Sequence, residues 1–191
     1  MMETKLSSKD IIIATAARLF ATQGYHGTGL NQIIKESGSP KGSLYYYFPN
    51  GKEELALECI NLIRRDLYSI LQELMARMPK PVDFMQAFVL NMADAIDASD
   101  TDPFVPFSLW VSAETSAVSD SLRAACQAAF AEWKAMIANK LVETGISRER
   151  ADTMADLSVC LIEGATIMAI VERHSTAIRR VAEHFPVILQ E

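Results

Sequence analysis

Residues 24–55 read GYHGTGLNQIIKESGSPKGSLYYYFPNGKEEL, and glycine and proline divide this stretch into short segments. Thr28 is placed to cap a short helix that stops at Gly38. Pro40 suits the first turn of the next helix, which ends at the Pro-Asn-Gly break over residues 49–51. Two short helices joined by a tight turn are the pattern of a helix-turn-helix unit.

A longer amphipathic helix is predicted ahead of this stretch. Ser7 or Ser8 can cap it, and Gly24 ends it, because a left-handed residue costs little at that position. Its apolar residues recur at helical spacing and form one stripe: Ile13, Ala16, Ala17 and Phe20. The three helices together therefore predict a small helix-turn-helix module, although generic three-helix modules share this spacing.

Helical periodicity continues to the end of the sequence, and no segment alternates as a strand does. The predicted fold class is therefore all-α, with about nine helices. We expect an N-terminal helix-turn-helix domain over residues 1–51, leading into helix four over 52–78, and a C-terminal helical ligand-binding and dimerisation domain over 52–191. The later helices are expected at residues 52–77, 82–98, 104–114, 120–143, 148–173 and 177–189.

The composition is that of a globular protein, with 191 residues, 50% hydrophobic and 22% charged. The three cysteines are far apart and form no Cys-x-x-Cys pair, so we expect reduced thiols, no metal and a cytoplasmic location. The first ten residues contain no apolar signal segment. Residues 154–171 are apolar enough to raise the alternative of a membrane span, but two carboxylates in so short a segment argue against it.

Charge is distributed unevenly along the chain. Residues 1–52 contain six Lys or Arg and three acidic residues, a charge of +3, whereas the rest contains twelve and twenty-one, a charge of −9. A basic N-terminal part on an acidic remainder is what a nucleic-acid-binding module attached to a second domain should look like.

Three adjacent tyrosines mark the predicted third helix. Leu44 and Phe48 share its inner face, and successive residues turn by about 100°, so at least two tyrosines must face outward. Hydroxyl groups can donate to phosphate oxygens, lysine adds positive charge, and glycine lets the backbone approach closely, so this face suits a partner that carries phosphates. An aromatic surface for protein packing is the alternative. The outward group consists of Lys41, Gly42, Ser43, Tyr45, Tyr46 and Tyr47.

The stretch over residues 24–55 resembles the DNA-binding domain of the TetR family, and the resemblance covers about residues 8–66. Matching positions are Gly24, Tyr25, Thr28, Ile33, Gly38, Lys41, Gly42, Ser43, Leu44, Tyr45, Tyr47, Phe48, Lys52, Glu53, Glu54 and Leu55. The resemblance implies that the third helix enters the major groove of double-stranded DNA, a palindromic operator. It also implies contacts with DNA from Thr28, Lys41, Gly42, Ser43, Tyr45, Tyr46, Tyr47 and Lys52.

Two departures from the family pattern are present. Pro40 replaces a small polar residue, and Gly51 adds one residue to the commonest turn before Lys52. This insertion is similar to the LmrA/YxaF-like branch, whose members often repress efflux genes. The third helix has no Arg, Asn or Gln for bidentate contact with a base, so we expect affinity to depend mainly on phosphates and on salt.

The stretch over residues 154–171 is apolar nearly all round, which predicts burial on two sides, against its own domain and a second subunit. The family builds its dimers from the last two helices, which implies a homodimer here. A two-fold dimer would place its reading helices about 34–36 Å apart, one turn of DNA, or a multiple of that. Candidate interface residues are Leu157, Leu161, Gly164, Ile178, Val181 and Phe185.

Aromatic residues and methionines gather in the middle of the sequence. Each one taken singly reads as ordinary core, but the set suits a pocket for an apolar or aromatic effector of unknown identity. We expect such a ligand to release a repressor from its operator. The candidate lining residues are Phe84, Phe88, Met92, Phe107, Trp110, Glu114, Trp133, Met136 and Met168.

An enzyme is the main alternative of another class. The three histidines are scattered, no spacing predicts a metal or cofactor site, and no nucleophile can be paired with a base, so we expect no catalysis. A protein–protein adaptor or ligand-binding protein of the same fold without operator binding is the remaining alternative. We expect repression rather than activation only because members of the family that it resembles are commonly repressors.

Overall fold

The computed structural model describes residues 7–98, 114 and 117–189, which form two compact units. The head unit contains the described residues 7–64, 114 and 117–126, and the body unit contains 65–98 and 127–189. All regular structure in the described residues is helical, so the predicted all-α fold class is confirmed. The sixth helix expected at 104–114 lies outside the described residues, apart from Glu114.

Helix α1 spans Ser8–Gly27 and begins at a capping box. The hydroxyl of Ser7 accepts from the backbone N–H of Asp10 at 3.2 Å, and the Asp10 carboxylate accepts from the N–H of Ser7 at 3.2 Å. The regular helix is interrupted at Gly24, where φ is +78°, and one more turn follows. The end predicted at Gly24 is therefore a kink, and Gly24 is needed there because φ is positive.

Helices α2 and α3 follow as the predicted pair, with α2 at Leu30–Ser37 and α3 at Lys41–Tyr47. Gly38 ends α2 in the left-handed region with φ +63°, as expected for the tight turn. Thr28 is not the N-cap of α2, which is Gly29 without a side-chain cap. The Thr28 hydroxyl is instead bonded to carbonyls of α1, which leaves the helix start to the next residue.

Helix α4 spans Lys52–Arg77, and its first turns complete the core of the head unit. Leu44 and Phe48 are fully buried in this core, together with Phe20 and Ile33. The thiol of Cys59 on α4 donates to the carbonyl of Ile13 on α1 at 3.6 Å. Helix α3 is thus held by its inner face, which packs against α1.

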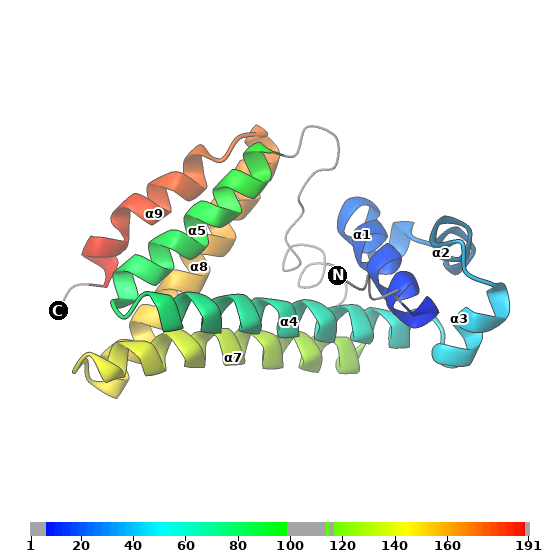
Figure 1. Cartoon of the computed structure of the whole chain (residues 1–191), viewed down its shortest axis with the longest axis horizontal. Coiled ribbons are helices and arrows are strands. Elements are labelled where there is room, and N and C mark those ends of the chain that lie inside the picture. Colours follow the sequence, from blue (N-terminus) through cyan, green and yellow to red (C-terminus); the bar gives the residue numbers. More distant parts are fainter. Residues whose placement is uncertain (1–6, 99–113, 115–116, 190–191) are drawn as a thin grey trace, which may run out of the picture. The chain divides into compact units, whose positions relative to one another are not determined.

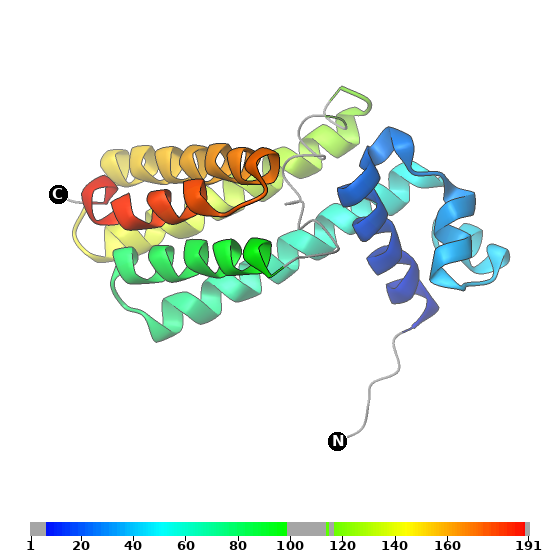
Figure 2. The same ribbon diagram turned by 90° about the horizontal axis from the view of Figure 1, so that it is seen from above.

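The body unit packs α5, Pro81–Asp97, against α9, Thr176–Ile188, and packs α9 against α8, Arg148–Glu172. These three helices lie side by side in both views (Figures 1 and 2). Helix α7, Asp120–Glu143, adds Ile137, Ala138 and Leu141 to the same core.

One face of α8 carries small residues into that core, while its opposite face is exposed and apolar. Helix α8 is long and apolar enough to cross a membrane, but core helices of soluble proteins can have the same length and composition. The exposed apolar residues of α8 are Leu157, Leu161, Ile167, Met168 and Val171.

Candidate nucleic-acid interface

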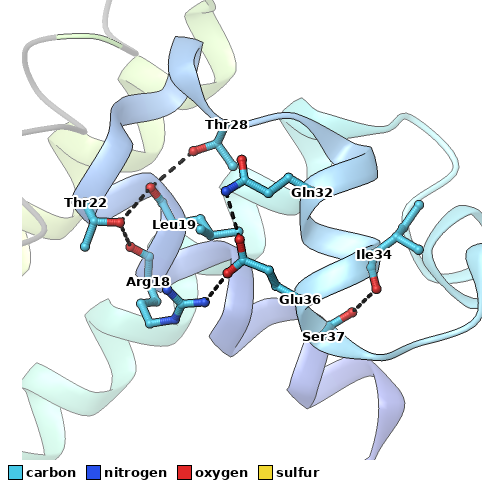
Figure 3. Close-up of polar contacts among 8 residues, drawn as sticks. All are labelled: Arg18, Leu19, Thr22, Thr28, Gln32, Ile34, Glu36 and Ser37. Carbon is cyan, nitrogen blue, oxygen red and sulfur yellow. Dashed lines mark hydrogen bonds and ion pairs between the residues drawn. The ribbon is translucent and has the colours of Figure 1, made fainter. Parts of the chain in front are cut away.

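Helices α1 and α2 are fastened by a short polar network (Figure 3). Arg18 of α1 donates to the Glu36 carboxylate at 2.5 Å, and the amide of Gln32 donates to the other Glu36 oxygen at 2.9 Å. The hydrogen bond from Arg18 holds the pKa of Glu36 below its ordinary value. The carboxylate therefore stays charged at neutral pH and keeps α2 against α1.

Helix α3 is anchored on one side and open on the other. Leu44 and Phe48 are buried, whereas 79% of Tyr46 and 45% of Tyr45 are exposed. The sequence argument that at least two tyrosines must face outward is confirmed. Lys41 and Gly42 are also exposed, while Ser43 and Tyr47 are half-buried. Six predicted contact residues therefore belong to one seven-residue helix, and we call them the α3 face: Lys41, Gly42, Ser43, Tyr45, Tyr46 and Tyr47.

Aromatic contacts brace the α3 face. The rings of Tyr46 and Tyr47 meet edge to face with their centroids 5.1 Å apart, and Tyr47 packs next to Phe48 at 6.4 Å. The ammonium of Lys41 lies 6.0 Å from the centroid of the Tyr45 ring. Such pairs restrict side-chain rotation, so less entropy is lost when a partner binds.

Two predicted contact residues lie elsewhere. Thr28 is only 1% exposed, and its hydroxyl donates to the carbonyls of Gly24 at 2.9 Å and Leu19 at 3.1 Å. Lys52 is half-buried, with its ammonium 4.4 Å from the centroid of the Tyr25 ring. Burial lowers the pKa of Lys52, and the nearby Glu114 carboxylate partly opposes this. The hydroxyl of Thr28 is thus engaged in the fold, and the Lys52 charge is engaged within the head unit.

Glu114 lies in the head unit, at the kink of α1. Its carboxylate accepts from the backbone N–H of Tyr25 at 2.5 Å and from that of His26 at 3.4 Å. The sequence grouped Glu114 with the aromatic pocket residues and missed this contact. A glycine with positive φ signals that N–H groups are exposed after it, but no spacing rule identifies a partner about 90 residues away.

The other proposed pocket residues fall into separate environments. Phe84 is buried in the core of the body unit, with Phe88 and Met92 packed against that core. Trp133 is buried and meets Phe130 edge to face at 5.2 Å, and Met136 is half-buried. Met168 is 49% exposed on the apolar face of α8. Phe107 and Trp110 lie outside the described residues.

Some of the proposed dimer residues are exposed, and others are buried in the core of the body unit. Leu157, Leu161 and Gly164 are exposed on α8. Ile178 and Phe185 are buried in the core of their own subunit, because the inner face of α9 packs there, and Val181 packs against that core.

Family models match both parts of the chain. Residues 12–59 match the model for bacterial regulatory proteins of the tetR family, and residues 81–184 match that for the C-terminal domain of LmrA/YxaF-like transcriptional regulators. The chain is 39% identical to the HTH-type transcriptional regulator YxaF of Bacillus subtilis strain 168 over 190 residues, 100% of this chain and 99% of YxaF. It is 38% identical to LmrA of the same organism over 183 residues, 96% of this chain and 97% of LmrA.

Solved structures share the fold. A TetR transcriptional regulator from Legionella pneumophila superposes with a TM-score of 0.87 at 17% identity, over 98% of this chain and 100% of its own. Reduced NemR from E. coli superposes with a TM-score of 0.81 at 24% identity, over 95% of this chain and 97% of its own.

Proposed function

This chain belongs to the TetR family of bacterial transcriptional regulators, with an LmrA/YxaF-like C-terminal domain, and from that premise we propose that it is a cytoplasmic repressor. As a homodimer it binds a palindromic operator and leaves it when a small apolar or aromatic effector binds. One observation carries the proposal. The α3 face presents ordered phenols and a lysine outward, while buried Leu44 and Phe48 fix the helix from behind.

In this proposal the α3 face enters the major groove. Ser43, Tyr45 and Tyr46 donate to phosphate oxygens, and Lys41 contacts a phosphate or a guanine. Gly42 is exposed and has no Cβ, so a partner can come close to its backbone. Thr28 and Lys52 support this face from within the head unit, and their contacts with DNA stay predictions from the family resemblance.

The second copy of the chain is proposed to cover the apolar face of α8. Leu157 is 54% exposed, and Leu161 and Gly164 lie one and two turns further along the same face. Large apolar side chains in one stripe are costly to leave in water, and a glycine within it permits close backbone approach. A two-fold contact there presents the α3 face twice.

The effector is proposed to bind in the body unit. Phe84, Phe88 and Met92 gather on α5, and Trp133 and Met136 lie on α7. Aromatic rings and methionine suit an apolar or aromatic ligand. Phe107 and Trp110 remain candidates from the sequence alone.

Footprinting of labelled genomic fragments tests the proposal, followed by titration of the site found. The triple variant Lys41→Ala, Tyr45→Ala, Tyr46→Ala is expected to lose specific binding while its thermal unfolding stays normal, because all three side chains are exposed. Lys80→Ala, which removes an exposed lysine from the body unit, is the charge-matched control and should bind normally. Unchanged affinity in a folded triple variant would favour an adaptor without operator binding.

A further inference from the structure

The kink of α1 exposes two backbone donors. Gly24 has φ +78°, which interrupts the helix, so the N–H groups of Tyr25 and His26 begin a new turn without carbonyl partners from the preceding one. The Glu114 carboxylate accepts from both, at 2.5 Å and 3.4 Å. It therefore serves as the N-cap of the last turn of α1, although it comes from a distant part of the sequence.

The fit of this carboxylate depends on glycine at position 24. A Cβ built on Gly24 would lie 2.4 Å from Glu114 Oε1 and 2.7 Å from Oε2, closer than a Cβ packs, so the Glu114 carboxylate would have to move away from the Tyr25 and His26 amides. Gly24 thus supplies both the positive φ that turns the N–H groups outward and the space in which the carboxylate approaches them.

Tyr25 carries this contact into the head core. Its ring lies 5.6 Å from that of Phe20 and under the ammonium of Lys52 at 4.4 Å. Lys52 also interacts electrostatically with Glu114. The backbone of Tyr25 is therefore bound by the carboxylate, while its side chain is held by the start of α4.

A second set of contacts ties the start of α4 to the start of α7. The hydroxyls of Ser119 and Ser121 each donate to Oε1 of Glu53 at 2.5 Å. These hydrogen bonds hold the pKa of Glu53 below its ordinary value. Ser119 precedes α7 and Glu53 lies in the first turn of α4, so the start of α7 is tied to the start of α4.

We propose that Glu114 is a positioning residue for operator binding, which fixes the end of α1 and, through it, the entry to α2 and α3. Thr28 follows this turn and donates its hydroxyl to the carbonyls of Leu19, before the kink, and of Gly24, at the kink. A change in the Gly24–His26 turn therefore moves the residue that leads directly into the reading helices. The inference rests on the proposed function, because it concerns the regulation of the same DNA-binding unit.

The full-length protein and its footprinted operator provide the test. Glu114→Ala removes the acceptor, and specific operator affinity is expected to fall about five- to tenfold per subunit, the worth of one N-cap, with little change on scrambled DNA. Glu114→Gln keeps an acceptor oxygen and should restore at least half of the loss on a logarithmic scale. Glu143→Ala, which removes an exposed glutamate at the end of α7, is the matched control.

Amide hydrogen exchange gives a readout at the contact itself. The Tyr25 and His26 amides should exchange faster in Glu114→Ala and regain protection in Glu114→Gln. Gly24→Ala should weaken operator binding in the wild-type background, and less so beside Glu114→Ala, since the carboxylate it would clash with is gone.

The outcomes separate the two proposals. A wild-type protein that binds no specific DNA would refute the proposed function. The positioning role alone would be overturned if Glu114→Ala bound the operator as tightly as the wild type does. It would also be overturned if Glu114→Gln bound the operator as weakly as Glu114→Ala. Should Glu114→Ala fail to fold, operator affinity is compared among Glu114→Gln, Gly24→Ala and the double variant. If the losses of affinity in the two single variants add up in the double variant, the inference is contradicted.

Discussion

Gly42→Ala should make the free protein more stable and its complex with DNA weaker. Gly42 is the second residue of α3, its φ is not positive, and an added Cβ meets nothing within 4 Å. Replacing a helical glycine by alanine stabilises a fold by about 0.5–1 kcal/mol, since the unfolded chain loses freedom. In a chain of this size 1 kcal/mol raises the melting temperature by about 2–4 °C.

The same methyl group projects from the α3 face. If it displaces one hydrogen bond to DNA in each half-site, the loss is about 1 kcal/mol per subunit, and a dimer on a palindrome loses about 2 kcal/mol. That corresponds to about thirtyfold in Kd. A substitution that raises the stability of the protein but weakens DNA binding marks a residue of the contact surface. Substitution of a residue needed only for folding would change stability and binding in the same direction.

Thermal unfolding and fluorescence anisotropy with operator DNA measure the two quantities on the same sample. Gly27→Ala is the control, because its added Cβ makes only an ordinary contact, 3.7 Å from Cβ of Gln23. It should leave operator affinity within about twofold, a change of less than about 0.5 kcal/mol. A Gly42→Ala protein that is more stable and binds its operator as tightly as the wild type would refute the placement of the α3 face on DNA.

Four further changes test other contacts. Lys41→Ala should reduce the slope of log Kd against log salt by about 0.9 per half-site, measured by titration at several salt concentrations. Thr28→Val, at the same shape, should cost about 1–2 kcal/mol in denaturant unfolding, because its buried hydroxyl bonds are lost. Leu157→Glu should convert the dimer to monomers in sedimentation analysis, since the charge would be buried between copies. The hydrogen bond from Ser175 is the main reason that the pKa of Asp97 is lowered, so the Asp97 carboxylate stabilises the fold at pH values above its ordinary pKa of 3.8. This stabilisation is lost as the pH falls below 3.8, and in Asp97→Asn the melting temperature should therefore depend less on pH in the acid range.

Local patterns in the sequence predicted most of the helices of the head unit. Gly24 and Gly38 both adopt positive φ, where glycine is cheapest, and both mark a break that the sequence predicts. Leu44 and Phe48 are four residues apart, so a helix must place them on one face, and both are buried. Local rules succeed here because backbone conformation and side-chain spacing are decided within a few residues.

Partners distant in the sequence could not be predicted in this way. Thr28 is a good N-cap by type, but a buried carbonyl of Leu19 competes for its hydroxyl and only the tertiary fold brings the two together. Glu114 meets Tyr25 across 89 positions. Ile178 and Phe185 show the same limit, because helical spacing defines an apolar face without telling which neighbour covers it.

In the proposed function, operator binding through the α3 face depends on dimerisation. Lys41, Ser43, Tyr45 and Tyr46 offer four hydrogen-bonding side chains, and at about 1 kcal/mol each they supply about 4 kcal/mol, a Kd near millimolar. Two such faces held rigidly on one palindrome supply about 8 kcal/mol, a Kd near micromolar, before the electrostatic gain from phosphates. In the proposed function, the apolar face of α8 that would join two copies is therefore as necessary for DNA binding as the tyrosines. A substitution on α8 that separates the subunits should weaken binding about as much as removing one α3 face.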